Sequence, residues 1–408
     1  MKRKVFVSTV TSIVMLIACS SFFDEAIVSK KKGLYLVDSD NIEINPTNCF
    51  YFSTLFKGIP KTIFLETSES CLIGLISKIR VCDQFFLVLD GYKAKSLFVF
   101  DKEGRFIRKI GRTGQGPGEY VQPCDFTIDK ENRTVYVLDR PLRRIQKYEI
   151  ETGKFIHSIR LDQKIGSNNI EYSNGKLYAD ADFPTHSNNN YLLRVIHEPS
   201  GKEENKFLNV VTYNKGISNT NFLQSNVFFP LENGNIVFMQ QFMDYIFEIS
   251  KDSIFSLIDF KGKEIMTAEE VNDAMAKDPV FYMPHLFGKR KFAHKHSFIE
   301  HRNKLFFYYQ KGQERFPVLI DKRSKDVSIF ATLWNDLLYI KKIPVDIQQV
   351  GCYDADGVYF FIEQGTMPLL LKEAKAGGLL SPDLDKLEEL KKLEEDANPV
   401  IFYYEFKD

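Results

Sequence analysis

The sequence is poor in the residues that most catalytic and metal centres use. Its 408 residues include 7 histidines, 6 cysteines and a single tryptophan. It contains neither a Gly-x-Ser-x-Gly nucleophile elbow nor a His-Glu-x-x-His zinc motif. These absences argue against a hydrolase of either kind. They leave open an enzyme whose polar groups come from several separate segments.

Cysteine usage excludes two further classes of protein. Five cysteines follow Cys19, an odd number at scattered positions, and no two form a Cys-x-x-Cys pair. A disulfide framework needs paired cysteines, and zinc fingers and ribbons need such close pairs. We therefore expect buried free thiols. A single bridge between Cys71 and Cys82, the nearest pair, is the alternative.

The chain has no excess of either charge, because 54 Lys and Arg residues balance 54 Asp and Glu residues. No block of like charge dominates. Nucleic-acid binding depends on clustered cations that neutralise phosphates. We expect no nucleic-acid partner.

The only long apolar run lies at the amino terminus. Residues 1–18 combine a basic start with an apolar stretch, which is typical of a secretory signal and too short for a membrane span. The last residues of the stretch, Leu-Ile-Ala before Cys19, resemble a bacterial lipobox, in which the Cys is acylated. The sequence predicts a signal peptide over 1–18, a tether over 19–33 and one folded domain over 34–408.

Acyl chains on Cys19 would anchor the protein firmly to a membrane. Ser20 is neutral at the position that decides retention in the inner membrane in many bacteria with two membranes. The predicted location is therefore the outer membrane, on either its periplasmic or its surface face.

One passage of the sequence occurs twice. Leu87–Asp90 is followed by a Gly-basic-aromatic turn and a strand at Gly104–Ile110, and the same pattern returns 49 residues later in Tyr136–Asp139 and Gly153–Ile159. Such a period is typical of a repeated sheet module. We interpret the repeat as a structural feature of each module, in which an Asp ends one strand and a Gly-basic-aromatic turn introduces the next.

Aromatic and β-branched residues with frequent turn signals predict an all-β protein. Strands that follow such turns are expected to start near Phe85, Val135, Lys176, Asn235, Lys304 and Val358. Their mean spacing of about 50 residues is that of propeller blades, which are four-stranded sheets stacked around a channel. The predicted fold is a six-bladed β-propeller, with five or seven blades as alternatives.

Two segments break the strand pattern. Thr267–Glu270 has the form of a capping box and opens a short helix that ends before Pro279. A second helix is expected from Ser381 to Asn398, with leucines at three-residue spacing that cover an apolar patch. The strand-like segment Val400–Phe406 suggests ring closure, with 42–56 as its expected partner.

Four segments resemble the six-bladed β-propeller lipoproteins of Bacteroides-type bacteria, which are related in fold to NHL-repeat and TolB-like propellers. The segments are Leu16–Cys19, Ile63–Thr67, Ile110–Tyr120 and Asn398–Phe402. The resemblance covers nearly the whole mature chain and implies the propeller fold. It implies little about activity, because members of that group are mostly of unknown function.

The Gly-rich segment Gly111–Tyr120 is the first candidate site. It joins two strands and lacks the Lys-Ser/Thr of a phosphate-binding loop, so a nucleotide site is not expected. The favoured interpretation is a tight connection between blades, in which Glu119 accepts backbone hydrogen bonds and Tyr120 packs. The alternative is a ligand rim that contains Arg112, Gln115, Glu119 and Tyr120.

Asp90 and Asp139 occupy equivalent repeat positions and are expected to cap the turns that follow their strands. Alternatively, their carboxylates converge on the channel and hold a cation or a polar substrate. Arg140, Arg143 and Arg144 follow the second Asp and would suit an anionic ligand, although pairing with nearby acids is favoured.

His294, His296 and His301 form the only histidine cluster. In an extended segment the first two project to the same side, as a metal arm requires. The surrounding lysines and arginine disfavour a cation, so we expect a basic loop, no metal and no cofactor.

The favoured function is non-catalytic binding of a protein, peptide or glycan in the bacterial envelope. One alternative is an envelope enzyme of the propeller lyase or hydrolase type, with Asp90 and Asp139 in its channel. A third is an assembly scaffold, with an exposed apolar patch at the leucine-lined helix.

Overall fold

A computed structural model of the chain describes residues 28–29, 33–40, 47–162, 166–181, 190–215, 226–278, 282–339, 348–362, 364–376 and 378–408. The predicted signal peptide, Cys19 and most of the predicted tether lie outside these residues.

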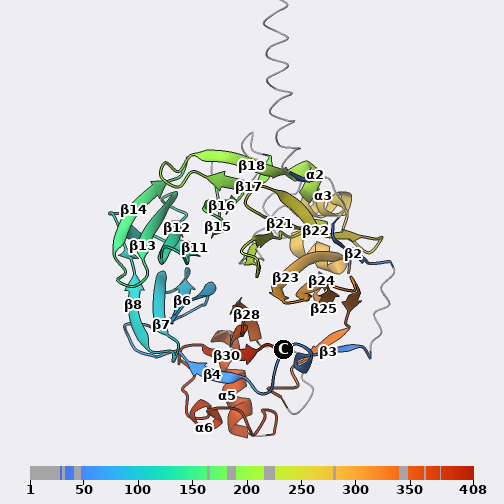
Figure 1. The fold of residues 1–408 in the computed structure, drawn as a ribbon. Helices are drawn as coiled ribbons and strands as arrows, with labels where there is room; N and C mark the ends of the chain where they lie inside the picture. The colour runs from blue at the N-terminus through green and yellow to red at the C-terminus, as the bar shows by residue number, and fades with distance from the viewer. Residues whose placement is uncertain are drawn as a thin grey trace, which may run out of the picture.

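The chain forms six small antiparallel sheets arranged in a ring, which is a six-bladed β-propeller (Figure 1). Blade 1 contains β5 (Lys78–Cys82), β6 (Phe85–Asp90), β7 (Ser96–Asp101) and β8 (Phe106–Ile110). Blade 2 contains β11 (Pro123–Asp129), β12 (Thr134–Asp139), β13 (Arg144–Glu149) and β14 (Phe155–Arg160). Blade 3 contains β15 (Ile170–Ser173), β16 (Lys176–Asp180), β17 (Tyr191–Ile196) and β18 (Glu203–Asn209). The predicted fold class and blade number are confirmed.

The second half of the ring has the same plan with additions. Blade 4 contains β19 (Phe228–Pro230), β20 (Ile236–Phe238), β21 (Tyr245–Ile249) and β22 (Ile254–Lys261). On its edge, β1 (Val28–Ser29) and β2 (Tyr35–Asp38) pair with β22 in parallel. Blade 5 contains β23 (Phe292–His301), β24 (Lys304–Lys311), β25 (Glu314–Asp321) and β26 (Val327–Ile329). Blade 6 contains β28 (Gln348–Tyr353), β29 (Gly357–Ile362), β30 (Val400–Glu405) and β4 (Lys61–Phe64).

Every strand start predicted from the sequence falls on the second strand of a blade. The observed starts are Phe85, Thr134, Lys176, Ile236, Lys304 and Gly357, each within one residue of its prediction. The second strand has a strand on each side and a neighbouring blade on each face, so it reads as a nearly continuous apolar run. The six residues of β29, for example, are all buried.

Ring closure is confirmed, but its predicted partner is wrong. The carboxy-terminal strand β30 pairs with β4 (Lys61–Phe64) as the outer strand of blade 6, and not with 42–56. Within that range, β3 (Cys49–Tyr51) instead pairs in parallel with β27 (Thr332–Trp334), and the short helix η1 (Phe52–Thr54) follows it. The end of the predicted range does contact the carboxy-terminal segment outside the sheet, through a bridge between Phe56 and Phe406 and a hydrogen bond from the Lys407 N–H to the Leu55 carbonyl.

Of the two predicted helices, the first is confirmed. Helix α3 (Ala268–Lys277) starts with a capping box, in which Thr267 Oγ1 accepts from the Glu270 N–H and the Glu270 carboxylate accepts from the Thr267 N–H. In the described part of the chain, helices also form outside the predicted segments, at α2 (Val210–Asn214), α4 (Tyr282–Gly288), α5 (Met367–Ala376) and the short η3 (Gln364–Thr366).

The second predicted helix is wrong. Between Ser381 and Asn398 the chain makes turns around a single short helix, α6 (Leu387–Leu390). A three-residue spacing drifts around a helix, so one helix could not turn all its leucines to the core, whereas turns can. Leu384 and Leu390 are buried, and Leu387 and Leu393 pack against the same core cluster. The exposed patch expected of a scaffold is therefore not formed by these leucines.

The hydrophobic core lies between neighbouring blades. One cluster, for example, joins Phe86 and Phe98 of blade 1 to Tyr359, Phe361 and Ile401 of blade 6. The five cysteines after Cys19, all in the described part of the chain, are free thiols as expected, although only Cys71, Cys82 and Cys352 are buried and Cys49 and Cys124 are half-buried. Cys71 and Cys82 are both buried, in different clusters.

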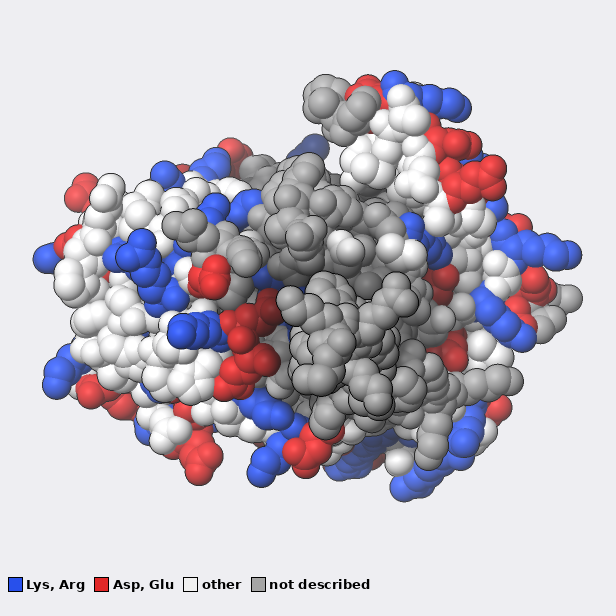
Figure 2. Space-filling model, turned by 90° about the horizontal axis from the view of Figure 1, so that it is seen from above, with Lys and Arg blue, Asp and Glu red and all other residues white. Residues whose placement is uncertain are grey.

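The described surface mixes both charges. On the side of the molecule shown in Figure 2, Lys and Arg side chains are interspersed with Asp and Glu. Among the described residues, no helix combines the length and the apolar character that a membrane span requires.

Candidate functional site

The inner strands of blades 1 to 3 carry a buried ionic network. Lys78 and Arg80 come from β5, Asp125 from β11 and Glu171 from β15. Lys78 Nζ lies 2.8 Å from Asp125 Oδ1, and an Arg80 guanidinium nitrogen lies 3.1 Å from Glu171 Oε2. Since β11 stands between the strands of Arg80 and Glu171, this pair connects blades that are not neighbours.

The buried cations and carboxylates of the network compensate one another. Burial lowers the pKa of Lys78 and raises that of Asp125, and in each case the opposite charge of the partner counteracts the shift. The hydroxyl of Thr127 donates to Glu171 over 3.0 Å, and the backbone N–H of Ile170 donates to Asp125 over 2.8 Å. Each of the two carboxylates is thus bound by both a cation and a neutral donor, which makes the network a cross-link between blades.

Our sequence interpretation missed this network. The available signal was the alternation of polar residues just before the second strands, as in Lys78 and Arg80 or Asp125 and Thr127. In a strand, such residues share one face. The pattern does not show that these residues meet, because their contact depends on the ring, which places the inner strands of blades 1, 2 and 3 side by side.

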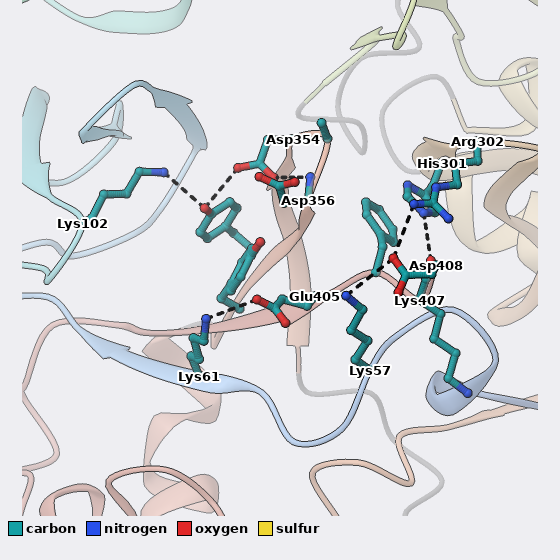
Figure 3. Close-up of a pocket in the computed structure, with 14 residues that line it drawn as sticks. Lys57, Lys61, Lys102, His301, Arg302, Asp354, Asp356, Glu405, Lys407 and Asp408 are labelled. Atoms are coloured by element: carbon teal, nitrogen blue, oxygen red, sulfur yellow. Dashed lines mark hydrogen bonds and ion pairs between the residues drawn. The ribbon is translucent and has the colours of Figure 1, made fainter.

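A polar cleft lies where the ring closes, with a volume of about 350 Å³ (Figure 3). Its walls come from turns of blades 1, 5 and 6, from Lys57 and from Lys61 at the start of β4, and from the carboxy-terminal residues. Nine of the lining side chains are Lys, Arg, Asp or Glu, and four are aromatic or imidazole rings. The lining residues are Lys57, Lys61, Lys102, His301, Arg302, Asp354, Ala355, Asp356, Tyr359, Tyr403, Glu405, Phe406, Lys407 and Asp408.

A chain of hydrogen bonds crosses one wall of the cleft. The phenolic oxygen of Tyr359 lies 3.2 Å from Lys102 Nζ and donates to Asp354 over 3.1 Å. The ring of Tyr403 lies 4.5 Å from that of Tyr359, between centroids. Lys61 Nζ lies 3.3 Å from Glu405 and 5.7 Å from the centre of the Tyr403 ring (Figure 3). Donors and acceptors therefore alternate along this wall.

Desolvation acts on the groups of this wall. Burial lowers the pKa of Lys102, and it raises the pKa values of Tyr359 and Tyr403, to which the nearby Asp354 charge also contributes. The two phenols are therefore neutral donors at physiological pH.

The opposite wall is made by the carboxy terminus. The His301 imidazole is stacked on the Phe406 ring, 3.9 Å between centroids, and its Nε2 lies 3.1 Å from the Lys407 carbonyl oxygen. The Asp408 carboxylate lies 3.5 Å from Arg302 and 3.8 Å from Lys57. The end of the chain is thus held as part of the cleft.

The Gly-rich segment predicted as a candidate is a self-bonded connection. β9 (Arg112–Thr113) and β10 (Glu119–Tyr120) pair in parallel within it. Glu119 accepts from the Gly116 N–H over 2.8 Å and from Arg112 over 2.7 Å, and these bonds hold its pKa below the usual range. The predicted backbone bonds of Glu119 are therefore present.

Tyr120 packs as predicted. It is fully buried, its hydroxyl donates to the Ile110 carbonyl over 2.7 Å, and burial raises its pKa to about 12. Gly111 has φ +70° and lies so close to the Tyr120 ring that a Cβ would come within 2.6 Å of it, so glycine is required there. Arg112 and Gln115 remain exposed at the surface of the connection.

The carboxylates of Asp90 and Asp139 are buried, and each accepts hydrogen bonds from backbone N–H groups. Asp90 accepts from the N–H groups of Gly74 and Leu75, which precede its blade, and of Tyr92 and Lys93, which follow its strand. The turn-capping interpretation is confirmed for Asp90, and its carboxylate is not a channel group.

At Asp139 the capped segment differs from the expected one. Asp139 accepts from the N–H groups of Val121 and Gln122, which enter the blade, and not from the turn that follows. Asp180 of blade 3, which our sequence interpretation did not include, accepts from Asn168 and Asn169 in the same way. The repeated Asp therefore fixes the entry to each of the first three blades.

The arginines after Asp139 lie near the Gly-rich connection. Arg144 donates to the carbonyl oxygens of Gln115 and Glu119, and its Nε lies 3.8 Å from Asp139. Arg140 and Arg143 are exposed. The Tyr120 hydroxyl of the Gly-rich connection accepts from the Leu97 N–H at the start of β7, whereas Lys102 of the cleft follows the end of β7. The Gly-rich connection and the cleft therefore lie at opposite ends of the strands.

The histidine segment is a strand and not the expected basic loop. His294 and His296 lie on β23 with ring centroids 6.3 Å apart, and Lys295 points to the other face, over the rings of Phe260 and Tyr309. Burial lowers the pKa of His294 to about 3 and of His296 to about 4. Within the described residues, no group of three or more His, Cys, Asp or Glu side chains is placed to hold a metal ion.

Among solved structures, the chain is similar to a "Putative exported protein" from Bacteroides fragilis NCTC 9343. The two are 18% identical with a TM-score of 0.71, over 92% of this chain and 99% of that one. A member of the duf4221 family from Bacteroides vulgatus is 8% identical with a TM-score of 0.44, over 86% and 97% of the chains. The hydrazine synthase of Kuenenia stuttgartiensis is 10% identical with a TM-score of 0.41, over 81% and 85%.

The first of these likenesses shows the fold alone, and the other two are too distant to carry an argument. No curated protein matches the sequence. The model of one family, a domain of unknown function named DUF4934, matches residues 37–405, which span the whole ring. The chain therefore belongs to the DUF4934 family.

Proposed function

We propose that the protein is an exported, lipid-anchored propeller that binds a glycan in the cleft at the ring closure without catalysing a reaction. The observation that carries the proposal is the wall formed by Lys102, Tyr359 and Asp354, beside the Lys61–Glu405 pair. The volume of about 350 Å³ falls at the lower end of the range of small-ligand pockets.

The charge arrangement favours hydroxyl groups over ions as ligands. A sugar hydroxyl both donates and accepts, so it can bridge Lys61 and Glu405, or Lys102 and Asp354, without separating either set of charges. An anion would have to compete with the carboxylate for its cation and would leave that carboxylate uncompensated. A polyhydroxylated ligand avoids this cost.

Export and anchoring are supported by the amino-terminal sequence. The signal-like segment 1–18 and the lipobox-like residues before Cys19 are the grounds for placing the protein in the envelope, at the outer membrane. The name of the similar Bacteroides fragilis protein agrees with export.

The catalytic alternative has less support. The two carboxylates that it placed in the channel, Asp90 and Asp139, are occupied by backbone N–H groups. The polar groups that do meet inside the ring, such as Lys78 and Asp125, are paired with one another.

Binding of a panel of glycans to the full-length protein, followed by calorimetry with the best ligand, tests the proposal. We expect Tyr403→Ala and Glu405→Gln each to weaken binding about 10- to 100-fold, the effect of losing one or two good contacts. Arg112→Ala, on the predicted Gly-rich rim, is the matched control and should bind like the unmodified protein. Weakening by Arg112→Ala alone would move the site to Gly111–Tyr120.

A further inference from the structure

We propose that two loops of blade 1 form a surface that rests on an anionic membrane. This surface, the blade 1 rim, consists of Leu72, Leu75, Tyr92, Lys93 and Lys95. It shares no residue with the cleft, and the proposal does not depend on glycan binding.

The rim exposes a concentration of apolar side chains. Tyr92 is 67% exposed, Leu72 50% and Leu75 36%. Single exposed apolar residues are normal, but three on two adjoining loops mark a contact surface. The loops do adjoin, because a Cβ added to Gly74 would lie 2.7 Å from the Cβ of Lys93.

The rim is held in place before any contact is made. The buried carboxylate of Asp90 accepts hydrogen bonds from Gly74 and Leu75 in one loop and from Tyr92 and Lys93 in the other, at 2.7–3.1 Å. Because these four backbone groups are already fixed, docking costs little ordering of the chain.

The side chains of the rim match the layers of a bilayer surface. Leucines favour the boundary of the hydrocarbon, and a tyrosine ring favours the headgroup level. Lys93 and Lys95 alternate with Ala94 directly after Tyr92, so their ammonium groups can reach lipid phosphates while their methylene stems lie along apolar surface. This combination of charge and apolar surface is why we choose an anionic bilayer over a protein partner.

The position of the rim determines the direction in which the cleft faces when the rim contacts a membrane. Tyr92 precedes β7 and Lys102 follows it, so the rim and the cleft lie at opposite ends of the same strand. A propeller that rests on its rim therefore presents the cleft away from the membrane, towards a ligand in solution.

Photo-crosslinking tests the proposal on the full chain reconstituted into vesicles of equal parts phosphatidylcholine and phosphatidylglycerol. Tyr92 is replaced by benzoylphenylalanine, and the control carries the same probe at Ile156, which is 42% exposed on β14. We expect lipid crosslinks from position 92 to exceed those from position 156 severalfold. Equal yields at the two positions would overturn the proposal.

Charge reversal separates membrane contact from chance proximity. Lys93→Glu with Lys95→Glu should lower the lipid crosslink from position 92 at least about tenfold, because each lysine near an anionic surface contributes about fivefold. Lys154→Glu with Lys202→Glu, in turns at the other end of the strands, should not change it. An unaffected yield in the rim variant, or crosslinks from position 92 to a protein in place of lipid in intact cells, would contradict the proposal.

Discussion

Arg80 of blade 1 and Glu171 of blade 3 lie 3.1 Å apart although a whole blade separates their strands. Their side chains are 12% and 8% exposed, so water screens the pair little. Together with Lys78 and Asp125, they hold three inner strands at a fixed separation.

Glu171→Gln is expected to destabilise the protein by about 3–5 kcal/mol, because it leaves two buried cations with one carboxylate. Chemical denaturation of the full chain measures the loss. Arg80→Met combined with Glu171→Leu should recover most of it, since apolar residues of similar volume often replace a buried pair. Arg105→Ala, which breaks an exposed pair with Asp101, is the control and should have little effect. A Glu171→Gln variant as stable as the parent would show that the network is not a cross-link.

Asp90→Ala should cost more stability than Asp139→Ala. The first leaves four backbone N–H groups without their acceptor, at about 2–4 kcal/mol in total, whereas the second leaves two, one of them bonded at 3.4 Å. Thermal unfolding of both variants measures the difference. Equal losses of stability would contradict the role of Asp90 in holding two loops of blade 1 together.

Acid should destabilise the protein through His294. Burial holds its folded-state pKa at about 3, below the ordinary 6.5, so the unfolded chain binds the extra proton and stability is lost as the pH falls from about 6.5 to about 3. His294→Phe should flatten the fall in melting temperature over this range, while His197→Phe, on an exposed turn, should not. Parallel pH profiles for the parent and the His294 variant would refute this explanation.

Asn398 fastens the entry to blade 1 beside the ring closure. Its Oδ1 accepts from the Ile73 N–H over 2.7 Å, and its Nδ2 donates to the carbonyl oxygens of Glu66 and Cys71 over 2.6 and 2.8 Å. Asn398→Asp should destabilise more than Asn398→Ala, although it preserves the shape, because a carboxylate oxygen would face two carbonyls. Unfolding midpoints of the two variants decide this, and the reverse order would contradict it.

The sequence predicted those parts of the fold that a short segment determines by itself, namely the second strands and the first helix. The second strands, such as Phe85–Asp90, have neighbours on all sides and are nearly all apolar, so their starts were placed within one residue. Thr267 and Glu270 form a capping box with fixed spacing. The four-residue strand β4 was missed because it is short and its partner lies at the other end of the chain.

The cleft has no such local signature. It assembles single residues from turns far apart, such as Lys102, Arg302 and Asp354, with both ends of the ring. The Gly-rich segment was singled out for its many glycines, yet these glycines allow close packing within the connection, with Gly111 against Tyr120 and Gly114 against Glu119. Prediction of the cleft would have required the correct strand pairing of blade 6 first.

Hydrogen exchange of the full-length protein, with and without the best glycan ligand, tests most directly whether the cleft is the binding site. The proposal predicts slower exchange in the turn at Asp354–Gly357 and in Tyr403–Asp408, with no change in Gly111–Tyr120. Protection confined to Gly111–Tyr120, or to the blade 1 rim, would contradict it.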